Sequence, residues 1–110
     1  MEPVALVEYV AADGHAPFTA WLDGLRDGLA RVRVARRLTR AQAGLLGDWK
    51  AVGNGVIELR EDYGPGYRIY CARHGAALLV LLAGGDKRTQ DKDIENAKAY
   101  WQEWKRRQPG

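Results

Sequence analysis

Residues 56–87 read VIELREDYGPGYRIYCARHGAALLVLLAGGDK, and this stretch decides the fold. Apolar and polar residues alternate along 56–60 and again along 67–73, which is the period of a half-buried strand. A continuous apolar run follows at 76–83, and a Gly-Pro-Gly and a His-Gly turn signal separate the three segments. We therefore expect consecutive antiparallel strands joined by short turns.

The flanking sequence adds one strand before this stretch and helices on both sides of it. Gly53-Asn54-Gly55 is a strong hairpin signal, which pairs a strand at 50–52 with the strand at 56–60. The expected order is β-α-α-β-β-β-β-α, an α+β fold whose central antiparallel sheet is packed by an N-terminal helical hairpin and a C-terminal helix. The remaining elements are a strand at 4–10, helices beginning at Pro17 and after Asp27, and a closing helix from Asp91 to about Arg107.

Each helix carries an apolar stripe at helical spacing, which predicts the face that it buries. We expect Asp27 to cap the second helix, which Gly44 and Gly47 then end. The predicted stripes are Phe18, Trp21, Leu22 and Leu25 in the first helix, Leu29, Val32, Ala35 and Leu38 in the second, and Ile94, Ala97, Trp101 and Trp104 in the third.

Composition limits the function classes. The 110 residues predict a single domain over 1–110, and 46% hydrophobic residues are enough for a core without disulfides. The one cysteine, Cys71, excludes an internal disulfide and fits a reducing compartment, so we expect a cytoplasmic protein. No apolar run reaches the roughly 18 residues of a membrane span, so we expect no membrane partner. His15 and His74 are distant in sequence, so we expect no metal site.

Positive charge is concentrated in the second helix. The net charge is +3, but six arginines fall between Arg26 and Arg40 against the single acid Asp27. A basic surface of this kind favours nucleic acid or an acidic protein partner, and a plain solvated helix face is the alternative.

Strand parity brings four polar side chains to one face of the sheet. If the apolar residues of 56–60 and 67–72 are buried together, then Glu58, Arg60, Arg68 and Tyr70 share the other face. These residues suit phosphate binding, but from parity alone a solvated face with cross-strand Glu–Arg pairs is the more ordinary interpretation.

Two further segments are candidate contacts. Gly84-Gly85-Asp86-Lys87 follows an apolar strand, and the glycines of such a turn could let backbone N–H groups approach an anion within reach of Lys87. A plain strand-to-helix turn is the alternative. Trp49 lacks the helical spacing of the other tryptophans, so it is a candidate for stacking on a base, next to Lys50.

In order and spacing, short motifs over roughly 9–105 resemble the RelE/ParE superfamily of bacterial toxins, in its HigB-like "addiction module killer" branch. The motifs that carry this resemblance are Asp13-Gly14, Pro17-Phe18, Trp21-Leu22, Ala30-Arg31, Gly47-Asp48, Lys50, Val52-Gly53, Gly55-Val56, Glu58-Leu59-Arg60, Gly64-Pro65-Gly66-Tyr67-Arg68-Ile69-Tyr70, Gly84-Gly85-Asp86-Lys87, Thr89-Gln90 and Trp101.

The resemblance implies a type II toxin without cofactors, neutralised by a cognate helix-turn-helix antitoxin of the HigA type. Many members cleave messenger RNA on the ribosome and so arrest translation. The ParE branch shares the fold but inhibits DNA gyrase, and a member that only binds its antitoxin is a third alternative. The antitoxin would cover either the cationic sheet face or the arginines of the second helix, which are Arg33, Arg36, Arg37 and Arg40.

For a nuclease, Arg68 matches the RelE-type arginine that stabilises the transition state, and Lys87 falls near a second RelE-type cation. Arg60 is a third candidate for phosphate contact. RelE-type nucleases carry a lysine at the position of Glu58, and a tyrosine or histidine in the region that reads RTQDKD here, at 88–93. We therefore take Glu58 as the hypothetical base, with Lys87 or Tyr70 as the acid. The expected RNA contacts are Trp49, Lys50, Tyr70 and Arg88.

Overall fold

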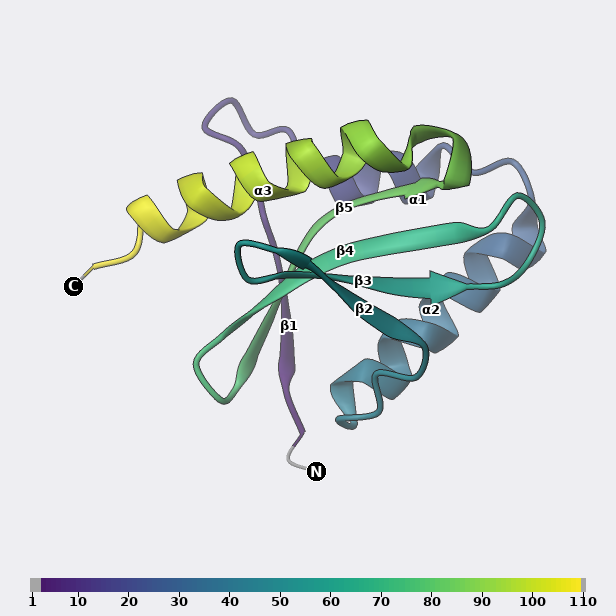
Figure 1. Cartoon of the computed structure of the whole chain (residues 1–110), viewed down its shortest axis with the longest axis horizontal. Helices are drawn as coiled ribbons and strands as arrows, with labels where there is room; N and C mark the ends of the chain where they lie inside the picture. Colours follow the sequence, from purple (N-terminus) through teal and green to yellow (C-terminus); the bar gives the residue numbers. More distant parts are fainter. Residues whose placement is uncertain (1–2, 110) are drawn as a thin grey trace.

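The computed structural model describes residues 3–109. It shows an α+β fold in which one five-stranded sheet lies between helices (Figure 1). The predicted order of elements is confirmed. The elements are β1 (Ala5–Glu8), α1 (Pro17–Asp23), α2 (Gly28–Gln42), β2 (Trp49–Gly53), β3 (Val56–Glu61), β4 (Tyr67–His74), β5 (Leu78–Asp86), the 3-10 turn η1 (Lys87–Thr89) and α3 (Gln90–Arg106).

The sheet is mixed rather than purely antiparallel. Its strand order is β1-β5-β4-β3-β2, so the four strands β2 to β5 form the predicted antiparallel meander. β1 adds a parallel edge strand beside β5, with Ala5 opposite Leu78. The antiparallel pairing places the end of β3, the start of β4 and the end of β5 side by side, and the candidate site lies there.

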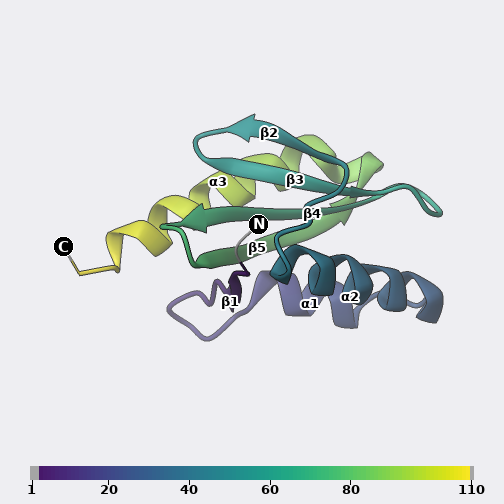
Figure 2. The same ribbon diagram turned by 90° about the horizontal axis from the view of Figure 1, so that it is seen from below.

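Helices cover both faces of the sheet. α1 and α2 lie on one face and α3 lies on the other, as the view in Figure 2 shows. The core under α1 and α2 includes Phe18, Val34, Leu59 and Ile69. The expectation of a solvated sheet face is wrong, because a second core fills the space between the sheet and α3. Its members include Tyr70, Val80, Leu82, Trp101 and Trp104.

The buried stripe of α2 differs from the predicted one. Leu29 and Val32 are each 52% exposed, whereas Ala30, Val34 and Ala41 are buried. The polar residue Arg37 lies within the buried stripe, so the stripe could not be recognised from apolar spacing alone. Its guanidinium reaches the carbonyl oxygen of Asp48 while the side chain remains partly buried, as long basic side chains commonly do. The small alanines bring the backbone of α2 close to the sheet.

The ends of the helices follow local chemistry. Asp27 caps α2 as predicted, since its Oδ1 accepts hydrogen bonds from the N–H groups of Leu29 at 3.0 Å and Ala30 at 3.3 Å. α1 begins at Pro17 as predicted but ends at Asp23, so Leu25 packs from the connecting segment. In α3 the predicted face is confirmed, and the rings of Trp101 and Trp104 stack with centroids 5.5 Å apart. None of the helices in the described range is long and apolar enough to span a bilayer.

The two glycines of the expected anion-binding turn instead lie inside β5. Gly84 backs onto the indole ring of Trp21, and Gly85 backs onto Asp93 and Thr89, so both glycines make room for side chains. The expected turn is therefore wrong, because both glycines belong to β5 and lie opposite Ile69 and Arg68 of β4.

This packing predicts the effect of a methyl group at Gly84. We expect Gly84→Ala to lower the free energy of unfolding by about 1–3 kcal/mol, because its Cβ would overlap the ring of Trp21. Urea unfolding measures this change. Gly28→Ala is the matched control, since nothing lies closer than 3.7 Å to a Cβ there and the residue opens α2. Equal stability of the two variants would contradict the close packing of Trp21 on β5.

Candidate functional site

The four polar side chains from β3 and β4 do share one face, as strand parity predicted. The register pairs Arg60 with Arg68 and Glu58 with Tyr70 across the two strands. However, this face lies under α3, so Glu58 and Tyr70 are fully buried and Arg68 is 8% exposed. Only the outer end of the face, beyond the start of α3, remains open.

Glu58 is held by three donors. Its carboxylate accepts hydrogen bonds from Gln90 Nε2 at 2.8 Å, from Arg60 Nε at 3.0 Å and from the Tyr70 hydroxyl at 3.1 Å. Burial by itself would raise the pKa of Glu58, but these hydrogen bonds and the charge of Arg68 outweigh it and hold the pKa below the ordinary carboxyl value. In this conformation the ionised carboxylate of Glu58 is fully buried and out of reach of a substrate, which argues against Glu58 as the base.

Tyr70 has a structural position rather than a binding one. Its hydroxyl donates to Glu58 inside the core under α3. Burial, followed by the neighbouring charge of Glu58, raises the pKa of Tyr70 far above the ordinary phenol value. In this conformation the Tyr70 hydroxyl is inaccessible to a ligand, which argues against Tyr70 both as an RNA contact and as the acid.

The three predicted cations meet in one concavity, which we call the cationic pocket. Arg60 comes from β3, Arg68 from β4 and Lys87 from η1, and the aliphatic stem of Lys87 lies against Gly66. The pocket has a volume of about 210 Å³. Its lining residues are Asp48, Arg60, Glu61, Asp62, Gly66, Arg68 and Lys87.

Arg68, like Lys87, forms no ion pair among residues 3–109. The Nε of Arg68 is buried and has no hydrogen-bond partner in that range. Arg60, in contrast, is fixed by its ion pair with Glu58 at 3.0 Å. A buried donor without a partner costs free energy, and because Arg68 lines the pocket its guanidinium group is available to an anionic ligand there.

The sequence interpretation missed the carboxylates of this pocket. Asp48, Glu61 and Asp62 line it together with the cations. Glu61 and Asp62 follow Arg60 directly in the sequence, so their proximity could have been predicted. Asp48 is brought in by tertiary structure, since its carbonyl oxygen accepts a hydrogen bond from the N–H of Arg60 at 2.9 Å.

Lys87 and Arg88 separate at the end of β5. Asp86 caps η1 by accepting from the N–H of Arg88 at 2.8 Å, and its carboxylate also pairs with the Arg88 guanidinium at 2.9 Å. The hydrogen bond from the Arg88 side chain lowers the pKa of Asp86. Lys87 lines the cationic pocket, whereas Arg88 lies outside that lining, already paired and exposed to solvent.

Trp49 and Lys50 lie on opposite faces of β2. Trp49 is opposite Leu59 and Lys50 is opposite Glu58, as the alternation of a strand requires. Both side chains are exposed, but they project from opposite faces of the strand. Trp49 instead lines an apolar groove beside α2.

The predicted arginines of α2 gather on one face, which we call the arginine surface: Arg33, Arg36, Arg37 and Arg40. Together with Glu61 they line a shallow depression of about 140 Å³. Arg33 pairs with Glu61 at 3.7 Å and lies over the ring of Tyr63, 4.6 Å from its centroid. Because Glu61 also lines the cationic pocket, the two basic regions adjoin.

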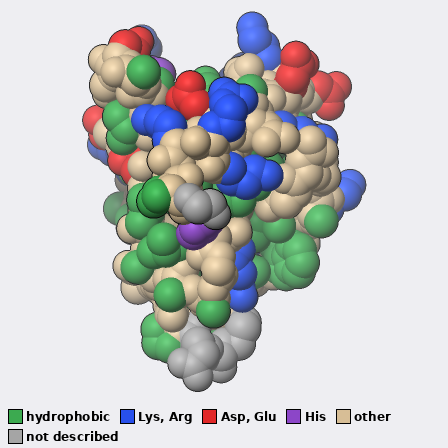
Figure 3. Space-filling model, turned by 90° about the vertical axis from the view of Figure 1, so that its left-hand side faces the viewer, with side chains coloured by type: hydrophobic (Ala, Val, Ile, Leu, Met, Phe, Trp, Pro, Cys, Tyr) green, Lys and Arg blue, Asp and Glu red, His purple; other side chains and the backbone are tan. Residues whose placement is uncertain are grey.

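Other reactive groups are isolated. In the described part of the chain, no three His, Cys, Asp or Glu residues are grouped so that they could hold a metal ion. Cys71 is buried, and burial raises the pKa of its thiol to about 12. On the side shown in Figure 3, the acidic side chains are confined to the upper part, where Lys and Arg also gather, and hydrophobic side chains extend below.

Comparison with known proteins identifies a relative. No protein-family model matches the chain. The chain is 46% identical over 86 residues to an uncharacterized protein of Haemophilus influenzae, and the match covers 78% of this chain and 87% of the relative. At this identity and coverage, the chain belongs to the same protein family as the uncharacterized Haemophilus influenzae protein.

Proposed function

We propose that the protein is the toxin of a type II toxin–antitoxin system, with a RelE-like fold of the HigB-like branch, and that it cleaves messenger RNA on the ribosome in the cytoplasm. The observation that carries this proposal is the convergence of Arg60, Arg68 and Lys87 on one pocket, in which the buried Nε of Arg68 has no partner among residues 3–109. The confirmed order of elements, β-α-α-β-β-β-β-α, also fits the resemblance.

In the proposed reaction a ribose 2′-oxygen attacks the adjacent phosphorus, and the bond from phosphorus to the 5′-oxygen breaks. Arg68 neutralises the charge that builds up on the phosphorane, and Arg60, fixed by Glu58, orients the phosphate. Lys87 protonates the leaving 5′-oxygen. Since Glu58 is buried, the base that accepts the 2′-hydroxyl proton is one of the exposed pocket carboxylates, Asp48 or Asp62.

A ParE-like gyrase inhibitor is the second candidate. The observation in its favour is that Asp48, Glu61 and Asp62 line the pocket beside the cations and repel an RNA phosphate. A protein that acts by binding gyrase needs no phosphate site, so these carboxylates do not count against it.

Mapping of RNA 5′ ends after brief induction in cells without the antitoxin tests the proposed function. We expect new cuts within coding regions, and we expect purified protein added to translating ribosomes to leave 2′,3′-cyclic phosphate ends on the messenger RNA. Growth arrest without new cuts, accompanied by relaxed or broken DNA, would support gyrase as the target instead. Absence of arrest would refute both toxic activities and leave a protein that only binds an antitoxin.

A further inference from the structure

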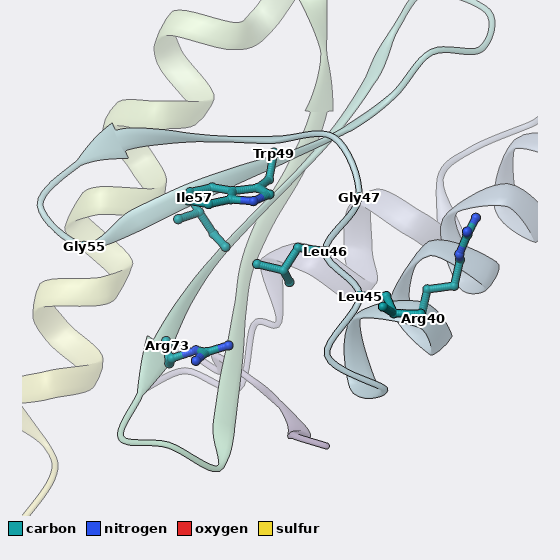
Figure 4. A pocket seen from close by; sticks show the side chains of 8 residues that line it. All are labelled: Arg40, Leu45, Leu46, Gly47, Trp49, Gly55, Ile57 and Arg73. Atoms are coloured by element: carbon teal, nitrogen blue, oxygen red, sulfur yellow. The ribbon is translucent and has the colours of Figure 1, made fainter. Parts of the chain in front are cut away.

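An apolar groove of about 730 Å³ lies between the end of α2 and the hairpin of β2 and β3. Leu46, Trp49 and Ile57 form its apolar wall, with Trp49 lying over Ile57 and Leu46 pointing toward them (Figure 4). Leu45, also part of the lining, is 56% exposed and Trp49 is 49% exposed. Large apolar side chains are thus left in water next to one another.

Such a patch differs from the isolated exposed residues of α2. Single exposed apolar side chains are ordinary on protein surfaces, but contiguous ones commonly mark interaction sites. The volume of the groove falls within the range of about 300–1,000 Å³ that is typical of ligand sites. The groove is therefore large enough to hold several apolar side chains of a partner.

The charge around the groove has one sign. Arg40 and Arg73 belong to the described residues that line it, and these include no Asp or Glu. Arg40 also lines the depression of the arginine surface, so the apolar groove leads directly onto Arg33, Arg36 and Arg37. Figure 4 shows Arg40 extending along α2, away from the apolar wall. The part of a partner chain that extends out of the groove would therefore lie against positive charge.

We propose that this groove docks an acidic amphipathic segment of a partner protein, with an apolar anchor in the groove and carboxylates along the arginine surface. RNA fits the groove less well, because Leu45, Leu46 and Ile57 offer no aromatic plane for a base and Trp49 is the one aromatic residue among the described lining residues. This inference goes beyond the proposed function, since peptide binding can be measured whether or not the protein cleaves RNA.

Selection of a phage-displayed library of random 12-residue peptides on the purified full-length protein tests this inference. We expect the enriched peptides to combine a large apolar residue with two or more Asp or Glu residues. Their affinity, measured by fluorescence anisotropy, should fall by about tenfold or more for Leu45→Ser, because the anchor loses its apolar contact. Affinity should also fall for Arg36→Glu combined with Arg40→Glu, and with rising salt.

Leu29→Ser is the matched control, because Leu29 is 52% exposed on α2 and lies outside the groove. Its affinity for the selected peptides should equal that of the wild type. Peptides that bind Leu45→Ser as well as the wild type would overturn the inference, as would enrichment without acidic residues. Two other occupants would also overturn it: a single-stranded RNA whose binding Leu45→Ser abolishes, or a wild-type dimer in sedimentation that Leu45→Ser converts to monomer.

Discussion

Arg68→Ala should reduce the cleavage of ribosome-bound messenger RNA by the purified protein by about 100- to 1,000-fold, which is the usual cost of removing one preorganised donor from a developing oxyanion. The physical reason is specific to this side chain. Arg68 is 8% exposed, and its buried Nε has no hydrogen-bond partner within residues 3–109. Its charge is therefore available to a phosphate and is only weakly screened by water.

Conservative replacement separates charge from geometry at Arg68. Arg68→Lys keeps the charge but loses the planar, bidentate donor pair, so we expect it to recover only part of the lost rate. Arg106→Ala, an exposed arginine of the last turn of α3, should cleave RNA at the wild-type rate. Urea unfolding should show that Arg68→Ala is folded. The Nε of Arg68 has no hydrogen-bond partner among the described residues, so its removal breaks no such hydrogen bond. A folded Arg68→Ala protein with wild-type cleavage would remove Arg68 from the mechanism.

Much of the fold could be predicted from local pattern. The alternation in 56–60 and 67–73 and the turn residues between the strands predict the meander, since short turns bring each strand beside the next one along the chain. The burial of both sheet faces was missed, although two signals were present. The run at 76–83 is apolar at every position, which is typical of a strand covered on both sides. Trp101 and Trp104 on the last helix also need an apolar surface to cover.

The site was harder to predict, because its chemistry depends on tertiary distances. Parity placed Glu58 and Arg68 on one face, but it could not show that α3 seals Glu58 and leaves the pocket end near Arg68 open. Likewise, Gly84 and Gly85 were predicted to form a turn, although glycine occurs both in turns and where another side chain packs against the backbone. Only the positions of Trp21 and Asp93 show that close packing is the reason here.

Glu58→Gln should lower the free energy of unfolding at pH 7 by about 2–4 kcal/mol. Removing one partner of a buried ion pair typically costs about 3–5 kcal/mol, and we reduce this figure because the side chain of Arg60 is 31% exposed and water can partly replace the carboxylate. Glutamine retains the volume of the side chain but lacks the charge that pairs with Arg60. Its NH₂ also needs an acceptor where Arg60, Tyr70 and Gln90 all donate in the wild type, so the Tyr70 hydroxyl or the Gln90 amide has to turn. In a domain whose total stability is about 5–15 kcal/mol this is a large loss.

The pH dependence of the same comparison identifies the charge as the cause. The pKa of Glu58 in the folded protein is lowered from its ordinary value, which is about 4.3 in the unfolded chain. The folded state therefore releases this proton more readily, and the ionised carboxylate contributes its full stabilisation above about pH 4.3. As the pH falls through the folded-state pKa, that contribution is lost. Urea unfolding should show the stability gap between wild type and Glu58→Gln widest at pH 7 and narrowing below about pH 4.

Glu61→Gln is the matched control on the same strand, because its carboxylate pairs with Arg33 at 3.7 Å near the surface. Exposed pairs of this kind contribute about 0–1 kcal/mol, so Glu61→Gln should change stability by no more than that. A stability gap for Glu58→Gln that stays constant between pH 7 and pH 3 would show that shape, and not the buried charge, stabilises this part of the sheet. If the gap narrows as expected, Glu58 is the residue that fixes Arg60 beside Arg68, and the same variant should then weaken RNA cleavage by displacing Arg60 and not by removing a base.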